Sequence, residues 1–241
     1  MGVVSIVLVA ANVLVWAWGL VSGGPDELFA RFGLFAGAAT SAAGTLIGEL
    51  GPAGSAASVD AGVGVGEWYR IFTSTFIHAG VLHLGMNMLF MWVVGRVVEE
   101  ELGAVDFVLV YLASMVSGSA GALSFDPFAV TVGASGALYG LLGAALVLQK
   151  SRGIDPWSTG LGTLVVVNLV ITFLVPQISI GGHLGGLLGG ALAELLLIAG
   201  ERVGLAWLGR AATLGMTFIG SWTAVSIAMF SVESGRALIG I

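Results

Sequence analysis

Long apolar runs separated by short polar connections dominate the chain. These runs cover residues 3–22, 71–95, 104–124, 133–149, 157–175, 181–199 and 207–230. A helix needs about 20 consecutive apolar residues to cross the hydrocarbon core of a bilayer. The pattern therefore predicts an all-α fold, a polytopic membrane bundle of about seven spans.

The first run needs its own interpretation, because a cleaved signal peptide is also apolar. No basic residue precedes this run, and it is longer than the apolar region of a signal peptide. We therefore predict that residues 3–22 are a transmembrane helix. The stretch 23–66 is rich in glycine, alanine and serine and contains a short apolar piece near 32–48. We predict that it is a loop, and its role stays unassigned.

The composition fits a membrane protein and excludes several other classes. Only 9% of the residues are charged, 57% are hydrophobic and the mean hydropathy is +1.04, whereas a soluble domain carries about 25% charged residues. The apolar content excludes intrinsic disorder, and the net charge of −6 excludes a nucleic-acid binder. The sequence has no cysteine, which rules out disulfides, thiolate catalysis and cysteine metal sites.

The eight basic residues predict the direction in which the spans run. Five of them follow the second, fourth and sixth spans, namely Arg96, Lys150, Arg152, Arg202 and Arg210. The other three are Arg31, Arg70 and Arg236. The positive-inside rule then puts the N-terminus in the cytoplasm and both the first loop and the C-terminus outside. An acidic triplet at 99–101 falls on the cytoplasmic side, where we expect a solvated helix end.

Three polar residues within or at the start of predicted spans lie at a similar depth. His83, Ser135 and His183 are 13, 15 and 19 residues from a basic residue at the cytoplasmic end of their spans. These separations correspond to about 20–28 Å, so all three lie in the outer half of a core about 30 Å thick. A serine and a histidine that meet there could act as a nucleophile and its base. For each histidine the alternative is a hydrogen bond to a neighbouring helix.

Helical periodicity places these candidates beside small residues. His83 shares a helix face with Asn87, and Ser135 shares one with Tyr139, because each pair is four residues apart. Glycine stripes run along the fourth span at Gly136, Gly140 and Gly143 and along the sixth at Gly182, Gly186 and Gly190. Such stripes are common in ordinary helix packing, and they also let two backbones approach closely. Here they flank the serine and the histidine.

Four motifs in this order resemble those of the rhomboid family of intramembrane serine proteases. Residues 133–136 (GASG) resemble the nucleophile motif GxSG, and residues 182–186 (GHLGG) resemble the helix of the catalytic histidine. Residues 78–87 (HAGVLHLGMN) match a histidine and asparagine pattern, and residues 67–70 (EWYR) resemble the Trp-Arg element of the first loop.

The resemblance covers residues 67–199, which would carry the catalytic motifs of a single membrane domain over residues 1–241. It implies a core of six helices. The stretch 23–66 would be an extracytoplasmic first loop without a counterpart in the family. The last run, 207–230, would be an extra C-terminal helix.

The resemblance also implies a Ser-His dyad. Ser135 would attack the scissile carbonyl and form an acyl-enzyme, and His183 would take the serine proton and deliver it to the leaving amine. Tyr139 would stack on His183 and replace a carboxylate as the orienting group.

Three further residues would stabilise the oxyanion, namely His83, Asn87 and Gly133, together with the backbone N–H of the serine. His78 would support the site by holding the loop or water near it. The alternative is that His78 only caps the outer end of the second span.

The remaining polar residues receive structural interpretations. Glu194 lies 11 residues from His183, or about 16 Å along a helix, so we expect it near the cytoplasmic end, paired or snorkelling. Asn168 is expected to form an interhelical hydrogen bond. Trp68 and Arg70 are expected to anchor the loop at the outer headgroup layer.

The resulting prediction is an intramembrane serine endopeptidase in the cell membrane, with its active site open to the outer face. Its substrates would be single-span membrane proteins whose helices unwind easily near that face. Besides the substrate and the lipid bilayer we expect no nucleic acid, no metal and no organic cofactor, because three histidines without carboxylates make a poor metal site.

Two other functions compete with this one. The first is a proteolytically inactive rhomboid-like protein that binds membrane-protein clients. Such relatives typically lack the serine or the histidine, and both are present here. The second is a transporter or channel. An inverted repeat and paired intramembrane charges would indicate one, and the sequence contains neither.

Overall fold

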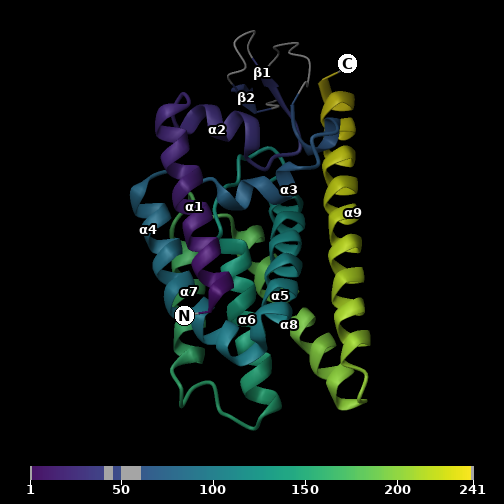
Figure 1. Cartoon of the computed structure of the whole chain (residues 1–241). Helices are drawn as coiled ribbons and strands as arrows, with labels where there is room; N and C mark the ends of the chain where they lie inside the picture. Colours follow the sequence, from purple (N-terminus) through teal and green to yellow (C-terminus); the bar gives the residue numbers. More distant parts are fainter. Residues whose placement is uncertain (1, 41–45, 50–60, 240–241) are drawn as a thin grey trace.

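The computed structural model describes residues 2–40, 46–49 and 61–239 (Figure 1). Its helices are α1 (Val3–Val21), α2 (Pro25–Phe32), α3 (Arg70–Thr73), α4 (Val81–Phe90), α5 (Arg96–Phe125), α6 (Ser135–Ser151), α7 (Leu161–Leu174), α8 (Ile180–Arg202) and α9 (Ala206–Ile239). Short 3-10 turns η1 (Val63–Val65) and η2 (Ser74–Phe76) and a π-helical turn η3 (Met91–Gly95) complete the helical part. The predicted helical bundle is confirmed.

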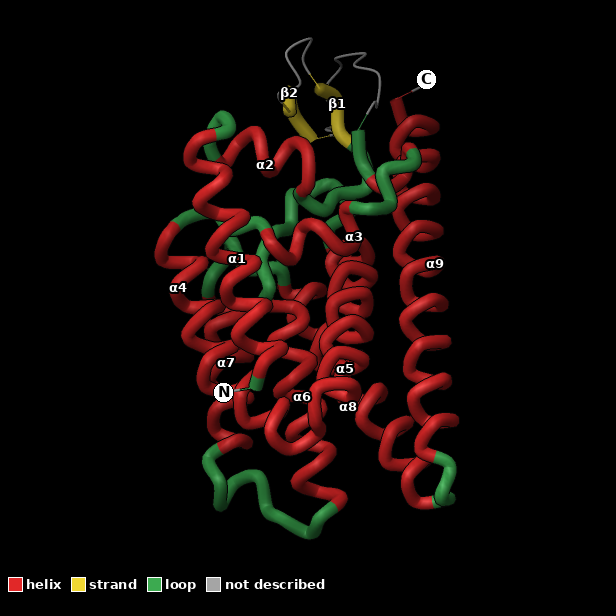
Figure 2. Tube along the Cα trace, in the orientation of Figure 1, coloured by secondary structure: helices red, strands yellow, loops and turns green. Residues whose placement is uncertain are grey.

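The first loop contains the only two β-strands among the described residues. Two short strands, β1 (Ala38–Thr40) and β2 (Leu46–Glu49), pair antiparallel with Ala38 opposite Glu49. They lie beyond α2 at the end of the bundle opposite the connections that follow α6 and α8 (Figure 2). Part of the loop expected at 23–66 falls outside the described residues.

Four helical stretches in the described part of the chain are long and apolar enough to cross a membrane. They are Val3–Val21, Val81–Phe125, Ile180–Arg202 and Ala206–Gly235. The second stretch combines α4, η3 and α5, and it contains a break at Gly103, where φ is 77° and ψ is 163°. Positive φ is unfavourable for other residues, so glycine permits this turn. The 14-residue helix α7 is apolar but shorter.

Helix α8 is the centre of the bundle and packs against α5, α6 and α9. Glycine brings α6 and α8 into backbone contact. A β-carbon on Gly186 would lie 1.9 Å from the main-chain oxygen of Gly136, and one on Gly190 would lie 2.0 Å from that of Gly140. The two predicted stripes therefore face each other, and the expected close approach of these helices is confirmed.

The second apolar run does not form one helix, contrary to the predicted span over 71–95. Residues 70–76 fold as α3 and η2 within the first loop, and α4 begins only at Val81. Ile71 and Ile77 are buried against other parts of the protein. The hydropathy of these residues predicts that they are buried away from water, but it does not distinguish burial in lipid from burial in protein. As a result His78 lies before α4, not on it.

Arg70 organises the first loop and is buried within the protein, so the expectation that it anchors the loop among headgroups was wrong. Its side chain is only 1% exposed. Its guanidinium donates to the main-chain oxygens of Gly33 (2.9 Å) and Ala30 (2.7 Å) and pairs with Glu67. These bonds compensate for the desolvation of the charge. Trp68, in contrast, is 61% exposed, as a surface anchor requires.

Glu99 is not the solvated residue expected at a helix end. It is buried, and its carboxylate accepts hydrogen bonds from the backbone N–H groups of Val4 (2.9 Å) and Ser5 (2.8 Å). These N–H groups belong to the first turn of α1, which has no intrahelical acceptors for them. The negative charge also complements the helix dipole. The contact joins the start of α1 to the start of α5.

Ion pairs connect several other charged residues at the same end. Arg96 pairs with Glu100, Arg152 pairs with Glu101, and Arg210 pairs with Asp106. The last pair uses two nitrogens of Arg210, at 2.7 Å and 3.1 Å from the two carboxylate oxygens. It connects α9 to α5. The side chain of Arg236 lies outside the described residues.

Candidate active site

Ser135 is the first residue of α6, and the turn before it depends on glycine. Gly133 has a φ of +115°, and its N–H donates to the main-chain oxygen of Ser74 at 2.9 Å. A β-carbon at this position would also lie 2.8 Å from the imidazole of His83. Glycine is therefore required at 133 both for the backbone conformation and for the contact. The turn leaves the serine half-buried at the helix N-terminus.

His183 faces Ser135 from the first turns of α8. Ser179 caps this helix by accepting a hydrogen bond from the N–H of Gly182 at 3.1 Å. The Nε2 of His183 lies 2.8 Å from the Oγ of Ser135. The histidine is 6% exposed. The close contact between the glycine stripes of α6 and α8 makes this short distance possible.

The ring of Tyr139 covers one face of the His183 imidazole. Its ring stacks on His183 with a centroid distance of 3.9 Å and an interplanar angle of 21°. Tyr139 follows Ser135 by one turn of α6, so the helix carries both the nucleophile and the residue that stacks on its partner. The stacking expected from the sequence is present.

Thr172 of α7 completes the surroundings of the histidine, and the sequence interpretation missed it. Its Oγ1 lies 2.8 Å from Nδ1 of His183 and 2.7 Å from the hydroxyl of Tyr139. A signal existed, because Thr172 is a hydroxyl residue four positions after Asn168, and the other residues of 164–174 are apolar. The sequence of this run alone does not show which helix packs against the face that carries Asn168 and Thr172.

Asn168 was expected to form an interhelical hydrogen bond, and the structure shows one at its main chain, while the Nδ2 of its side chain bonds within its own helix. Its Nδ2 donates to the main-chain oxygen of Leu164 in its own helix at 2.8 Å. The interhelical hydrogen bond instead reaches the main-chain oxygen of Asn168, which accepts from the hydroxyl of Tyr139 at 2.7 Å.

His83 and Asn87 lie on α4 beside the serine turn. The ring edge of His83 with Cε1 and Nε2 faces Gly133, and its Nδ1 lies 3.3 Å from the backbone N–H of Ala79. Asn87 is buried and donates through Nδ2 to the main-chain oxygen of His83 at 2.9 Å. This bond uses one of the two Nδ2 hydrogens. The structure thus brings His83 next to Gly133, while the contact of Asn87 lies within its own helix.

The ring of His78 lies in the loop before α4 and packs against His83. Its ring lies 5.0 Å from that of His83 in an edge arrangement, and its side chain is buried. Burial, with a smaller contribution from the neighbouring His83, lowers the pKa of His78 to about 4. His78 is therefore neutral at pH 7. It does not cap α4, since that helix begins three residues later.

Glu194 takes no part in the dyad. It is 2% exposed on α8, and among the described residues its Oε2 has no hydrogen-bond partner. The expectation that it is paired or snorkels is therefore wrong for this oxygen. The described residues also contain no group of three or more histidine, aspartate or glutamate side chains that could hold a metal ion.

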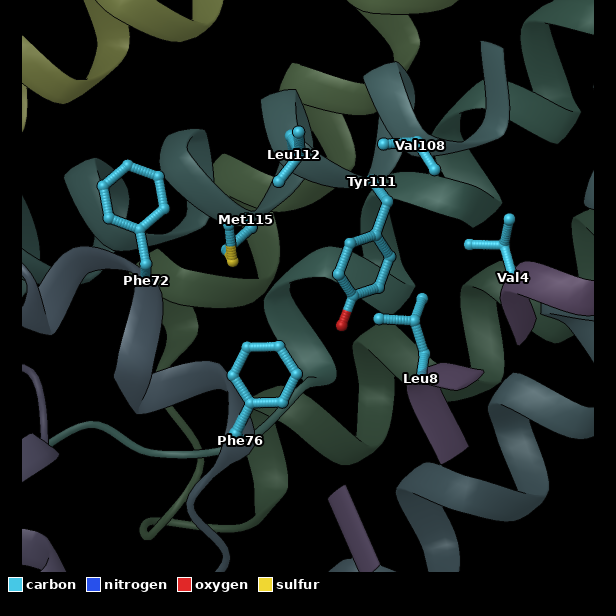
Figure 3. Close-up of a pocket in the computed structure, with 8 residues that line it drawn as sticks. All are labelled: Val4, Leu8, Phe72, Phe76, Val108, Tyr111, Leu112 and Met115. Atoms are coloured by element: carbon cyan, nitrogen blue, oxygen red, sulfur yellow. The ribbon is translucent and has the colours of Figure 1, made fainter. Parts of the chain in front are cut away.

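An apolar cavity lies apart from the dyad. Its volume is about 240 Å³, and it is lined by residues of α1, α3, η2 and α5 (Figure 3). The lining residues are Val4, Leu8, Phe72, Phe76, Val108, Tyr111, Leu112 and Met115. The lining contains neither the serine nor the histidine, so the cavity is not the place where a peptide bond would meet them.

Comparison with known proteins shows that the region carrying these residues matches a known protein domain. A family model described as "Rhomboid domain" matches residues 65–200. Rhomboid protease GluP of Bacillus subtilis (strain 168) is 38% identical over 135 residues, which are 55% of this chain and 26% of that protein. Putative rhomboid protease YdcA of the same organism is 36% identical over 141 residues, which are 57% of this chain and 71% of that protein. Inactive rhomboid protein 1 of Bos taurus is 34% identical over 128 residues, which are 52% of this chain and 15% of that protein.

Proposed function

The chain belongs to the rhomboid family, and we propose that it is an intramembrane serine endopeptidase with a Ser135–His183 dyad. The observation that carries the proposal is the distance of 2.8 Å between Ser135 Oγ and His183 Nε2. A hydrogen bond between nucleophile and base at this distance is the arrangement that acyl transfer needs. The stacking of Tyr139 on the imidazole supports it further, because stacking restricts the ring to one orientation.

The dyad would act in two steps. Ser135 Oγ attacks the carbonyl carbon of the scissile bond while His183 Nε2 takes the hydroxyl proton. The imidazolium then protonates the leaving amine as the C–N bond breaks, which leaves an acyl-enzyme. Water attacks the ester in the second step and gives its proton to His183. Collapse of the intermediate releases the carboxylic acid and returns the proton to Ser135.

The oxyanion that forms in each step requires hydrogen-bond donors. Ser135 begins α6, so its backbone N–H has no acceptor within the helix. His83 Nδ1 accepts from the N–H of Ala79, which leaves the proton on Nε2, the nitrogen that faces Gly133. The second hydrogen of Asn87 Nδ2 is the third donor. We propose these three groups as the oxyanion hole.

The protease would span the membrane about seven times, if the shorter helices α6 and α7 cross together with the long stretches. This number counts the helices on the two sides of Gly103 separately and adds α6 and α7 to the four long stretches. The ion-paired ends with Arg96, Arg152 and Arg210 would lie in the cytoplasm, together with the N-terminus. The dyad would then open toward the outer face of the cell membrane. Its substrates would be single-span proteins cut near that face.

One alternative has a specific observation in its favour. Inactive rhomboid protein 1 is among the similar proteins, so membership of the family does not by itself imply catalysis. In that alternative the chain binds membrane-protein clients without cutting them. The contact between Ser135 and His183 favours the protease, because a binding protein has no need of an aligned nucleophile and base.

Covalent labelling with a fluorophosphonate probe separates the two functions. The purified, detergent-solubilised protein is compared with Ser135→Ala and His183→Ala, and circular dichroism verifies the folding of all three. We expect wild type to be labelled and both variants to remain unlabelled. A folded wild type that is neither labelled nor able to cut a panel of single-span reporter proteins would favour the client-binding function.

A further inference from the structure

We infer that Thr172 is a positioning residue that sets the tautomer of His183, an inference that rests on the proposed protease function. A base for Ser135 must present a lone pair at Nε2, so the proton of the neutral imidazole must be on Nδ1. Something must accept a hydrogen bond from that N–H. In a Ser-His-Asp triad a carboxylate does so. Here the atom in that place is the hydroxyl oxygen of Thr172, 2.8 Å from Nδ1.

A hydroxyl can donate as well as accept, so the neighbours of Thr172 decide its role. Three oxygens form a small triangle beside the imidazole, namely Oγ1 of Thr172, the hydroxyl of Tyr139 and the main-chain oxygen of Asn168. Their separations are 2.7 Å between Tyr139 and Thr172, 2.7 Å between Tyr139 and Asn168, and 2.9 Å between Thr172 and Asn168. Each separation is within hydrogen-bond range.

The triangle contains two protons, one from each hydroxyl, because a carbonyl oxygen has none. When both protons stay inside it, two of its three sides are hydrogen bonds. If Thr172 instead donated to Nδ1, a single proton would remain for three close oxygen pairs. Buried oxygens at such distances without an intervening hydrogen repel each other. The triangle therefore keeps the proton of Thr172, and Thr172 accepts from Nδ1–H.

Burial strengthens this preference. Thr172 is 1% exposed, Tyr139 is 5% exposed and His183 is 6% exposed, so water does not readily replace a missing partner. Hydrogen bonds in a low-dielectric interior also carry more energy than those in water. The arrangement presents the Nε2 lone pair to Ser135 before any substrate arrives.

The role of Thr172 is one of position, since it touches neither the nucleophile nor the scissile bond. It differs from a carboxylate in having no charge, so it orients the imidazole without stabilising the imidazolium. Loss of the correct tautomer in a carboxylate triad lowers turnover by about 10⁴-fold. For a neutral hydroxyl we expect a loss of about 10–100-fold, because the charge contribution is missing from the start.

Three variants test the inference. Thr172→Val keeps the shape and removes the hydroxyl, and Thr172→Ser keeps the hydroxyl and removes a methyl group. Thr163→Val is the matched control, because Thr163 is an exposed residue of the same helix. We expect the fluorophosphonate labelling rate to fall by about 10–100-fold in Thr172→Val, to recover to within about threefold in Thr172→Ser and to stay unchanged in Thr163→Val. For a peptide substrate the loss should appear in kcat and not in KM.

A spectroscopic measurement keeps the inference separate from activity. In protein labelled with 15N-histidine, the nitrogen chemical shifts distinguish the two tautomers, and His183→Ala identifies the signals of this residue. We expect Nδ1–H in wild type and in Thr172→Ser, and a shift toward Nε2–H in Thr172→Val. Thermal unfolding of each variant verifies that it is folded.

Several results would overturn the inference. These are an Nε2–H tautomer in wild type, an unchanged tautomer in a folded Thr172→Val, or a Thr172→Ser variant as slow as Thr172→Val. The last result would indicate methyl packing instead of the hydroxyl. Failure of the proposed function looks different, because wild type would then show the Nδ1–H tautomer without any labelling or cleavage.

Discussion

At the scale of single residues, the candidate site consists of neutral groups held by hydrogen bonds and stacking. Ser135 contacts His183, and His183 contacts both Thr172 and Tyr139. An ionised carboxylate among these buried helices would have a large desolvation cost unless it were paired. A hydroxyl orients the imidazole without that cost. This gives a physical reason for a dyad without an acid in a membrane protein.

Asn87→Ala tests the proposed oxyanion hole at this scale. Removing one oxyanion donor typically lowers kcat by about 10²–10³-fold. We expect a loss of this size in kcat for a single-span reporter, with KM changed by less than about threefold, because the interaction forms only in the transition state.

Asn87→Asp is the companion variant, since it keeps the size of the side chain and removes the amide hydrogens. It should lose at least as much activity as Asn87→Ala. A folded Asn87→Ala with wild-type kcat would show that the amide of Asn87, whose observed bond goes to the main-chain oxygen of His83, takes no part in the reaction.

At the scale of helices, the glycine contact between α6 and α8 determines whether the serine and the histidine can meet. Gly186 and Gly190 leave no room for a β-carbon between the two backbones. A side chain there would push the helices apart by an amount comparable to its own radius. A hydrogen bond of 2.8 Å does not tolerate such a displacement.

Gly186→Ala should therefore abolish activity without touching a polar residue of the site. Its β-carbon would lie 1.9 Å from the main-chain oxygen of Gly136. We expect fluorophosphonate labelling to fall at least about 100-fold, since a misplacement of about 1 Å can cost that much. The thermal unfolding temperature should fall as well, because overpacking costs about 1–3 kcal/mol.

Gly85→Ala is the matched control for this prediction. Gly85 lies in the middle of α4, and a β-carbon there would meet nothing within 4 Å. Alanine also favours a helix over glycine by about 1 kcal/mol. Labelling and stability should both be retained. Equal loss in Gly85→Ala and Gly186→Ala would show that the close contact is not the reason for the effect.

At the scale of the whole molecule, α9 belongs to the scaffold and lies outside the region that matches the family, which ends at residue 200. The helix packs along α5 and α8, and Arg210 pairs with Asp106 near its start. Ala224, Ala228 and Val232 are fully buried against the rest of the protein. None of the site residues lies on α9, so its contribution should concern stability alone.

Ala228→Leu tests this division of roles. Ala228 is 0% exposed, and its main-chain oxygen lies close to Gly64 of η1. Extra methyl groups in a packed site destabilise by about 1–3 kcal/mol. We expect a lower unfolding temperature and an unchanged labelling rate for the folded fraction. Phe230→Leu, at a residue that is 70% exposed, should change neither quantity. A reduced rate in fully folded Ala228→Leu would indicate that α9 influences the dyad.

The sequence by itself determined the class of fold and the helices that carry the candidate site. Apolar runs predicted the helical bundle because a bilayer selects for length and hydropathy, both of which are local properties. Glycine spacing predicted the contact between α6 and α8, since small residues at helical intervals define a face. Depth along the helices indicated that Ser135 and His183 could meet, and the family resemblance indicated the stacking of Tyr139.

Only the tertiary structure decided which polar faces meet and which apolar residues turn inward. Thr172 contacts His183 because of the rotation of α7 about its axis, a quantity that no local pattern contains. Ile71 and Ile77 are buried in the first loop. Glu99 of α5 is buried against the first turn of α1. Hydropathy and charge predict whether a side chain is buried or exposed to water. The residues that pack against it or hydrogen-bond to it belong to segments distant in the sequence.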